Sequence, residues 1–204
     1  MHAGEDREER QGGRHRGRHR GRNALRLLAV VAAALLGTAR PGAQAPFTLS
    51  SADLREGGRL DAAQRYSRDG CGGANRSPQL SWQHAPRGTR AYAITMFDPD
   101  APGRGWWHWA VTGIPAEVTS LPANASASGV LRRLGASEAR NDFGTDGYGG
   151  ACPPPGKPHR YVITVYALDS DRLRSAQGRP AQLFDHEIRV SALAYARLTV
   201  TDER

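Results

Sequence analysis

The sequence contains no long apolar run and, after residue 45, no long repeated unit. The apolar segment Leu27–Leu36 has ten residues, whereas a helix that spans a bilayer needs about 20. No unit of about 20 to 50 residues recurs after residue 45, which excludes repeat arrays. The 24 glycines and 13 prolines indicate many turns and exclude a long helical rod. With 39% hydrophobic and 24% charged residues, the 204 residues indicate a globular chain with one domain of ordinary size.

Excess basic charge is scarce outside the first 45 residues. The whole chain carries a formal net charge of +8, but residues 1–45 hold nine Arg and four acidic residues and account for +5 of it. The remaining 159 residues are nearly balanced, at +3. Closely spaced arginines can neutralise phosphates, so the leading segment alone would also suit a nucleic-acid-binding arm. Because the rest of the chain is nearly neutral, we expect no nucleic-acid partner.

The basic segment precedes an apolar run and a cleavage motif. A Gly-Arg-His-rich stretch leads to Leu27–Leu36, and small residues follow up to Ala43-Gln44-Ala45. This order is typical of a secretory signal peptide. We predict a signal peptide over residues 1–45 and one domain over residues 46–204, located outside the cytoplasm as a secreted, periplasmic or cell-envelope protein. An uncleaved leader that anchors the protein to the membrane is the alternative, and without a nearby cysteine a lipoprotein anchor is not expected.

The only two cysteines, Cys71 and Cys152, both follow the leader. Export to an oxidising compartment permits a disulfide between them. The alternative is a pair of small buried thiols, because the sequence alone does not show whether the two Cα atoms come within about 7 Å of each other. Both possibilities remain open at this point.

Apolar residues alternate with period two in short segments separated by Gly, Pro, Asn and Asp, which is typical of antiparallel strands. The clearest segments are Ala91–Phe97, Trp107–Ile114 and Tyr161–Leu168, and weaker ones are Phe47–Ser51 and Pro78–Trp82. The segment Tyr161–Leu168 is largely apolar on both faces, so we expect it inside a sheet. The fold class predicted from this pattern is mainly β.

The apolar period changes near the end of the chain. Apolar or small residues recur at spacings of four, four, three and four, at Phe184, Ile188, Ala192, Tyr195 and Thr199. This spacing predicts a C-terminal helix that covers the sheet. The stretch 122–140 is rich in Ala and Ser, and we expect a loop there with at most a short helix.

Three segments concentrate residues that could form a site. Asp98–Pro102 follows a predicted strand, Trp106–Trp109 (WWHW) begins the next, and Asp146–Gly156 is a loop rich in Gly and Pro. Strand alternation places His108 on the face opposite Trp107 and Trp109. Each segment alone also has a purely structural explanation, as a turn, a packed strand or a tight loop.

Together, these segments suggest a small pocket for an anion at the strand ends. Consecutive N–H groups of a Gly-rich loop can converge into an anion-binding nest. A histidine has an unperturbed pKa near 6.5 and a phosphate monoester a second pKa near 6, so both can be charged near neutral pH. Asp98 would repel a bare phosphate. It would therefore orient an imidazole, accept a hydrogen bond from a protonated phosphate, or hold a cationic group of the same ligand, which would suit a zwitterionic head group.

The motifs resemble those of the phosphatidylethanolamine-binding protein family, in particular its bacterial Raf kinase inhibitor-like branch. The resemblance rests on Asn75–Trp82, Asp98–Pro102, Trp107–Trp109, Gly147–Pro154 and His159–Tyr161, which occur in the family's order. It implies a sandwich of two antiparallel sheets with a few short helices and an anion pocket at one edge. Carried over residue by residue, the pocket would be lined by Asp98, Asp100, Trp106, His108, Tyr148, Cys152, Pro153, His159 and Tyr161.

The resemblance implies non-catalytic binding of small anions or phosphorylated head groups, with no metal ion or cofactor. An inhibitor of a protease, or another regulator that binds proteins, is an alternative. A weak hydrolase is a second alternative, although no G-x-S-x-G motif is present. His108, His159 and Asp98 could also bind a metal ion, but His108 and His159 do not have the H-x-x-x-H or H-x-H spacing of a metal-binding motif. The oligomeric state and the natural ligand are left open.

Overall fold

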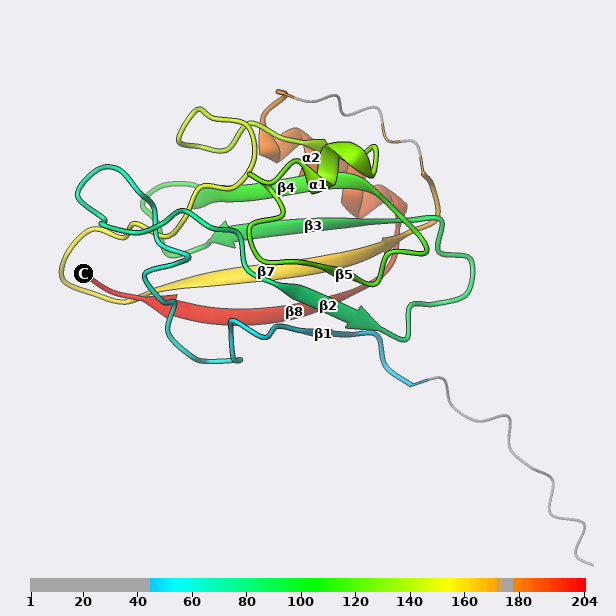
Figure 1. The fold of residues 1–204 in the computed structure, drawn as a ribbon, viewed down its shortest axis with the longest axis horizontal. Coiled ribbons are helices and arrows are strands. Elements are labelled where there is room, and N and C mark those ends of the chain that lie inside the picture. Colours follow the sequence, from blue (N-terminus) through cyan, green and yellow to red (C-terminus); the bar gives the residue numbers. More distant parts are fainter. Residues whose placement is uncertain (1–44, 172, 174–177) are drawn as a thin grey trace, which may run out of the picture. The chain divides into compact units, whose positions relative to one another are not determined.

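A five-stranded antiparallel sheet forms the centre of the fold. The computed structural model describes residues 45–171, 173 and 178–204. In spatial order the strands are β6 (Ser137–Glu138), β4 (Trp106–Pro115), β3 (Ala91–Asp98), β7 (His159–Leu168) and β8 (Ala192–Asp202). The strand β7 lies between β3 and β8, which confirms its predicted place inside a sheet (Figure 1).

A smaller antiparallel sheet covers one face of the first. It consists of β1 (Thr48–Ser50), β2 (Leu80–Gln83) and β5 (Ser120–Leu121), in that order. The strand β1 lies within the predicted segment Phe47–Ser51. The strand β2 overlaps the predicted segment Pro78–Trp82 and extends one residue beyond it. A four-residue helix, α1 (Val130–Arg133), lies in the stretch where a short helix was expected.

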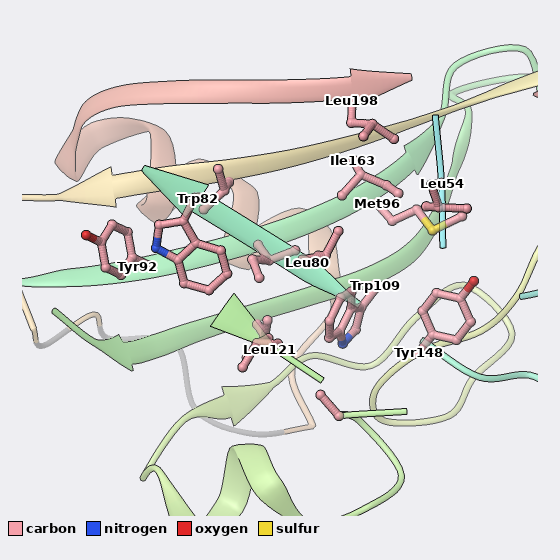
Figure 2. Close-up of a cluster of buried hydrophobic side chains, with 14 of the residues drawn as sticks. Leu54, Leu80, Trp82, Tyr92, Met96, Trp109, Leu121, Tyr148, Ile163 and Leu198 are labelled. Atoms are coloured by element: carbon pink, nitrogen blue, oxygen red, sulfur yellow. The ribbon is translucent and has the colours of Figure 1, made fainter. Parts of the chain in front are cut away.

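Alternation along the strands divides the buried side chains between two hydrophobic clusters. Between the two sheets, Leu80 and Trp82 of β2 pack with Met96, Trp109 and Ile163 of the large sheet (Figure 2). On the opposite face of the large sheet, a second cluster includes residues of the helix α2 (Ala181–Ser191). The two apolar faces of β7 are thus explained, because one faces the small sheet and the other faces α2.

The C-terminal helix is shorter than the sequence predicted. Phe184 and Ile188 are buried on α2 as expected, but the helix ends at Ser191 and Ala192–Asp202 forms the strand β8. In β8 the buried residues alternate, at Ala196, Leu198, Val200 and Asp202. The segment therefore has an alternating period of two, whereas the sequence pattern had indicated a period near four. The prediction of a helix through Thr199 is wrong from Ala192 onward.

The leader predicted over residues 1–45 lies outside the described residues, except for Ala45. The described residues form one compact unit. Among the described residues, no helix is long and apolar enough to cross a membrane.

Candidate functional site

The loops at one end of the large sheet enclose a cavity of about 400 Å³. It lies where β3 ends and where β4 and β7 begin, at the same end of the sheet as the C-terminus of the chain (Figure 1). Its walls contain Asp69, Asp98, Ala101, Pro102, Trp106, His108, Phe143, Cys152, Pro153, Pro154, Pro155, His159, Tyr161 and Arg204. Seven of the nine residues carried over from the family resemblance are in this set.

Asp98 joins the turn after β3 to the first residue of β7. Its Oδ1 accepts hydrogen bonds from the backbone N–H groups of Asp100 and Ala101, at 2.8 and 3.0 Å. Its Oδ2 accepts a hydrogen bond from Nδ1 of His159, at 2.7 Å. Both side chains are almost fully buried, at 4% and 2% exposure. The carboxylate therefore orients the imidazole of His159. The bond uses Nδ1 and leaves the second ring nitrogen, Nε2, out of it.

A β-bulge places His108 in the cavity wall. In the pairing of β3 with β4, Met96 lies opposite Trp109 and Phe97 opposite Trp107, so that His108 has no partner on β3. An extra residue of this kind breaks the alternation of the strand and re-aims its side chain. Trp109 packs between the sheets, whereas Trp107 packs on the side of α2. The expectation that these two tryptophans share one face is therefore wrong.

The backbone of the Gly-rich loop fixes the ring of His108. Its Nδ1 lies 2.8 Å from the carbonyl oxygen of Gly149 and 3.1 Å from that of Gly150. Carbonyl oxygens only accept hydrogen bonds, so Nδ1 carries the proton and Nε2 is the nitrogen available to a ligand. Burial lowers the pKa of His108 below its usual value, opposed by the Gly149 carbonyl and, more weakly, by Asp98. The ring is therefore neutral at neutral pH when the cavity holds no anion.

Two buried donors in the wall have no acceptor. The indole Nε1 of Trp106 and the hydroxyl of Tyr161 are buried and make no hydrogen bond among the described residues. Burial raises the pKa of Tyr161, with Asp98 acting in the same direction and the backbone of Cys152 acting weakly against it. The hydroxyl consequently keeps its proton. An unpaired buried donor costs free energy, and a ligand with acceptor atoms would relieve this cost.

Arg204 and the disulfide hold together the side of the cavity that is formed by distant loops. Cys71 and Cys152 form a disulfide, with their Cα atoms 5.5 Å apart. The Arg204 guanidinium donates hydrogen bonds to the backbone oxygens of Pro153, at 2.9 Å, and Asp69, at 3.3 Å. Because these oxygens belong to neutral peptide groups, the bonds leave the positive charge of Arg204 unneutralised.

Two predicted site residues lie outside the cavity wall. Asp100 instead forms an ion pair with Arg160, at 2.7 Å, and this guanidinium lowers the pKa of the Asp100 carboxyl far below its usual range. Tyr148 donates its hydroxyl to the backbone oxygen of Gln64, at 2.8 Å, and packs edge-on against Trp109. In each case another partner holds the side chain away from the cavity.

The glycine loop is not an anion-binding nest. The N–H of Gly149 donates to the backbone oxygen of His108, and that of Gly150 donates to Oδ1 of Asn75. The glycines at these two positions serve close packing. A Cβ on Gly149 would lie 2.5 Å from Phe143, and one on Gly150 would lie 2.4 Å from the backbone around Arg65. The loop thus supplies carbonyl oxygens to His108, and the N–H groups of Gly149 and Gly150 are already used.

The sequence did not reveal several wall residues, among them Asp69, Phe143 and Arg204. Asp69 lies two residues before Cys71, so a disulfide to Cys152 would have indicated its position. Phe143 stacks on Tyr66 with ring centroids 3.9 Å apart, and no spacing along the chain marks this contact. Arg204 reaches the cavity because β8 runs back beside β7. No group of three or more potential metal ligands occurs in the part of the chain that the structure describes.

Comparisons with known proteins agree with this architecture. A model of the phosphatidylethanolamine-binding protein family matches residues 50–203. The UPF0098 protein YbcL of Escherichia coli is 42% identical over 158 residues, which make up 76% of this chain and 86% of YbcL. The UPF0098 protein YbhB of the same organism is 40% identical over 152 residues, which make up 74% of this chain and 96% of YbhB.

A solved structure and a mycobacterial relative extend the comparison. The crystal structure of E. coli YbcL, described as a new member of the mammalian PEBP family, matches with a TM-score of 0.76. The match has 40% identity and covers 78% of this chain and 99% of YbcL. LppC of Mycobacterium tuberculosis, which is named as a lipoprotein, is 35% identical over 132 residues, or 64% of this chain and 59% of LppC. A lipoprotein name points to the cell envelope for that relative.

The match over residues 50–203 spans nearly all of the described chain. The two E. coli relatives are at least 40% identical to it over the aligned residues, which make up most of their own length. The fold agrees with these matches, since the mainly β sandwich of two antiparallel sheets is also that of YbcL. The chain therefore belongs to the phosphatidylethanolamine-binding protein family.

Proposed function

We propose that the cavity binds a small anion, or the phosphorylated head group of a larger molecule, without transforming it chemically. The observation that carries this proposal is the pair of buried donors without acceptors, the Trp106 indole and the Tyr161 hydroxyl. Oxygen atoms of a phosphate or carboxylate would accept both hydrogen bonds. The Arg204 guanidinium and the two oriented imidazoles add positive charge or further donors. Family membership supports a ligand-binding role in general.

The zwitterionic head group of phosphatidylethanolamine is one member of this ligand class. Asp98 already uses both carboxylate oxygens, in the turn and in the bond to His159. It therefore suits the role of orienting an imidazole better than that of holding an ammonium group. The exposed Asp69 in the wall is the carboxylate that would receive the ammonium. Phosphoethanolamine should consequently bind somewhat more tightly than inorganic phosphate.

Isothermal titration calorimetry on the full chain, with inorganic phosphate and phosphoethanolamine, tests the proposal. The variants Trp106→Phe and Tyr161→Phe each remove one donor and keep most of the ring. A hydrogen bond to a charged group contributes about 1.5–3 kcal/mol, so each variant should bind at least tenfold more weakly. Tyr148→Phe is the matched control, because its hydroxyl is engaged outside the cavity.

The wild-type protein and Tyr148→Phe should bind alike. Absence of binding at millimolar ligand by the folded protein would contradict the proposal, as would an equal loss in all three variants. Binding without turnover also predicts that nitrophenyl phosphate stays intact in the presence of the protein. Release of nitrophenol that disappears in His108→Ala would show that the site is catalytic.

We propose that this binding takes place outside the cytoplasm, in the secreted or cell-envelope fraction. The support is the arrangement of basic, apolar and small residues in the first 45 positions. The disulfide between Cys71 and Cys152 also suits an oxidising compartment.

A further inference from the structure

A second, smaller hollow lies beside the helix α1 (Figure 1). Its volume is about 250 Å³, and it shares no wall residue with the cavity at the end of the large sheet. Five of its seven wall residues are serine, alanine or glycine. The other two, Arg132 and Glu138, carry opposite charges. A molecule in this hollow would therefore meet one cation and one carboxylate in an otherwise neutral wall.

Glu138, on the strand β6, is fixed through one of its two carboxylate oxygens. Its Oε1 accepts hydrogen bonds from Nε1 of Trp109, at 2.8 Å, and from the hydroxyl of Ser126, at 2.6 Å. Its Oε2 accepts no hydrogen bond from the described residues. Burial raises the pKa of the Glu138 carboxyl, opposed by the bonds from Ser126 and Trp109. A cationic donor at Oε2 would supply the missing bond and favour the charged form.

Arg132 lines the same hollow from the helix α1. Its side chain is exposed, and its guanidinium forms no ion pair or hydrogen bond with the described residues, Glu138 included. A guanidinium presents its N–H donors in a planar fork that matches the two oxygens of a carboxylate. The hollow thus separates two opposite charges that do not neutralise each other. A ligand with the reverse arrangement of charges would pair with both.

The neutral part of the wall limits the size and the polarity of such a ligand. The two serine hydroxyls are used inside the protein, because Ser126 donates to Glu138 and Ser128 donates to the backbone oxygen of Ala125, at 3.2 Å. The volume is below the range of roughly 300–1,000 Å³ that is typical of sites for drug-sized molecules. The hollow therefore suits a small molecule whose main polar contacts are made by its two charged ends.

From these observations we infer that the hollow beside α1 binds a small free amino acid as its zwitterion. The ammonium group donates to Oε2 of Glu138, and the carboxylate accepts from the guanidinium of Arg132. This inference goes beyond the proposed function and does not depend on it, because the two sites have no residue in common.

An NMR titration of the isotope-labelled full chain tests the inference. The indole N–H of Trp109 is the reporter, because it donates to Glu138 and its signal should shift when an ammonium group arrives there. The probes are glycine, β-alanine and γ-aminobutyrate, which carry the same two charges at increasing separation. At least one of them should bind with millimolar affinity. Acetate and methylammonium carry only one of the charges and should bind at least tenfold more weakly.

Two variants and one control locate the binding. Glu138→Gln keeps an oxygen that accepts from Trp109 and Ser126 but replaces the second carboxylate oxygen with an amide donor. Glu138→Gln and Arg132→Gln should each weaken amino-acid binding at least tenfold. Arg133→Gln is the matched control, because Arg133 is also exposed on α1 but is not in the wall of the hollow. It should bind the amino acids as the wild type does.

The outcomes separate this inference from the proposed function. No shift of the Trp109 signal at tens of millimolar of any of the three amino acids would overturn the inference, as would binding that persists in both Glu138→Gln and Arg132→Gln. Methylammonium that binds as tightly as the amino acids would also overturn it, because Arg132 would then hold no carboxylate. Saturating inorganic phosphate should leave amino-acid affinity unchanged, and competition between the two would contradict a separate site. Amino-acid binding by a protein that binds no phosphate would support this inference and contradict the proposed function.

Discussion

At the scale of single residues, the two histidines of the cavity are prepared for a ligand by different partners. A carboxylate holds His159 and two backbone carbonyls hold His108. In both rings Nδ1 is used inside the protein, so each presents Nε2 to whatever enters. The difference in partners matters for charge, because only His159 has an anion in direct contact.

The lowered pKa of His108 predicts a pH-dependent affinity. Without ligand the ring is neutral near pH 7, since burial lowers its pKa below about 6.5. A bound anion favours the imidazolium form, so the complex holds more protons than the free protein. Affinity should therefore rise as pH falls and weaken at least tenfold between pH 6 and pH 8. Sulfate is the suitable probe, because its charge does not change in this range.

Calorimetry in two buffers with different ionisation enthalpies would count the protons taken up on sulfate binding. His108→Asn should show less proton uptake and a weaker pH dependence than the wild type. His186→Asn serves as the control, since His186 is exposed on α2. Affinity that is constant from pH 6 to pH 8 would show that His108 does not meet the anion.

Which site residues could be predicted from the sequence depended on where they lie in the strands. Asp98, His108 and His159 stand at or near strand ends, and their proximity follows once the strands are paired. Phe143 and Arg204 could not be predicted, because contacts between distant loops bring them to the cavity. Asp100 was wrongly included because alternation does not reveal that Arg160 lies beside it.

At the scale of elements, the strands whose alternation has no competing period were predicted. The strand β8, whose local pattern also fits a helix, was not. Ala91–Phe97 and Tyr161–Leu168 alternate without competing periods, and both are strands within two residues of the expected bounds. In Ala192–Thr199 small and apolar residues fit both a helical and an alternating period. Pairing with β7 along the whole of β8 decides in favour of the strand. That tertiary contact is not visible in the local pattern.

The disulfide links two loops that no secondary structure connects directly, and its loss should be costly. It closes a segment of 81 residues between Cys71 and Cys152. Chain-entropy reasoning for a loop of this size gives a stabilisation of roughly 4 kcal/mol. The double variant Cys71→Ala/Cys152→Ala should lose about this much free energy of unfolding, measured by urea titration under oxidising conditions.

The same titration in the presence of a reductant provides the comparison. Reduced wild type and the double variant should unfold at nearly the same urea concentration, because neither has the cross-link. If the oxidised wild type were no more stable than the variant, the cross-link would have no stabilising role.

At the scale of the whole molecule, the uneven distribution of charge along the chain bears on the cellular compartment in which the protein acts. Removal of residues 1–45 would reduce the net charge from +8 to +3. We expect the protein recovered from the periplasm of an expressing bacterium to begin at Pro46, because the sequence predicts cleavage after Ala45. Intact-mass measurement and N-terminal sequencing check this, with the unprocessed chain from the cytoplasm as the comparison. Full-length protein in the membrane fraction would favour the uncleaved anchor.

The bulge at His108 also has a consequence for how such a site could be lost in evolution. Without His108, Trp107 and Trp109 would be consecutive and would still face opposite sides of the sheet, as the pairing with Phe97 and Met96 requires. A single-codon deletion would thus restore regular pairing at this point of the strand and at the same time remove one wall of the site. Relatives that have kept the sandwich but abandoned the ligand should therefore include chains that are one residue shorter at this point.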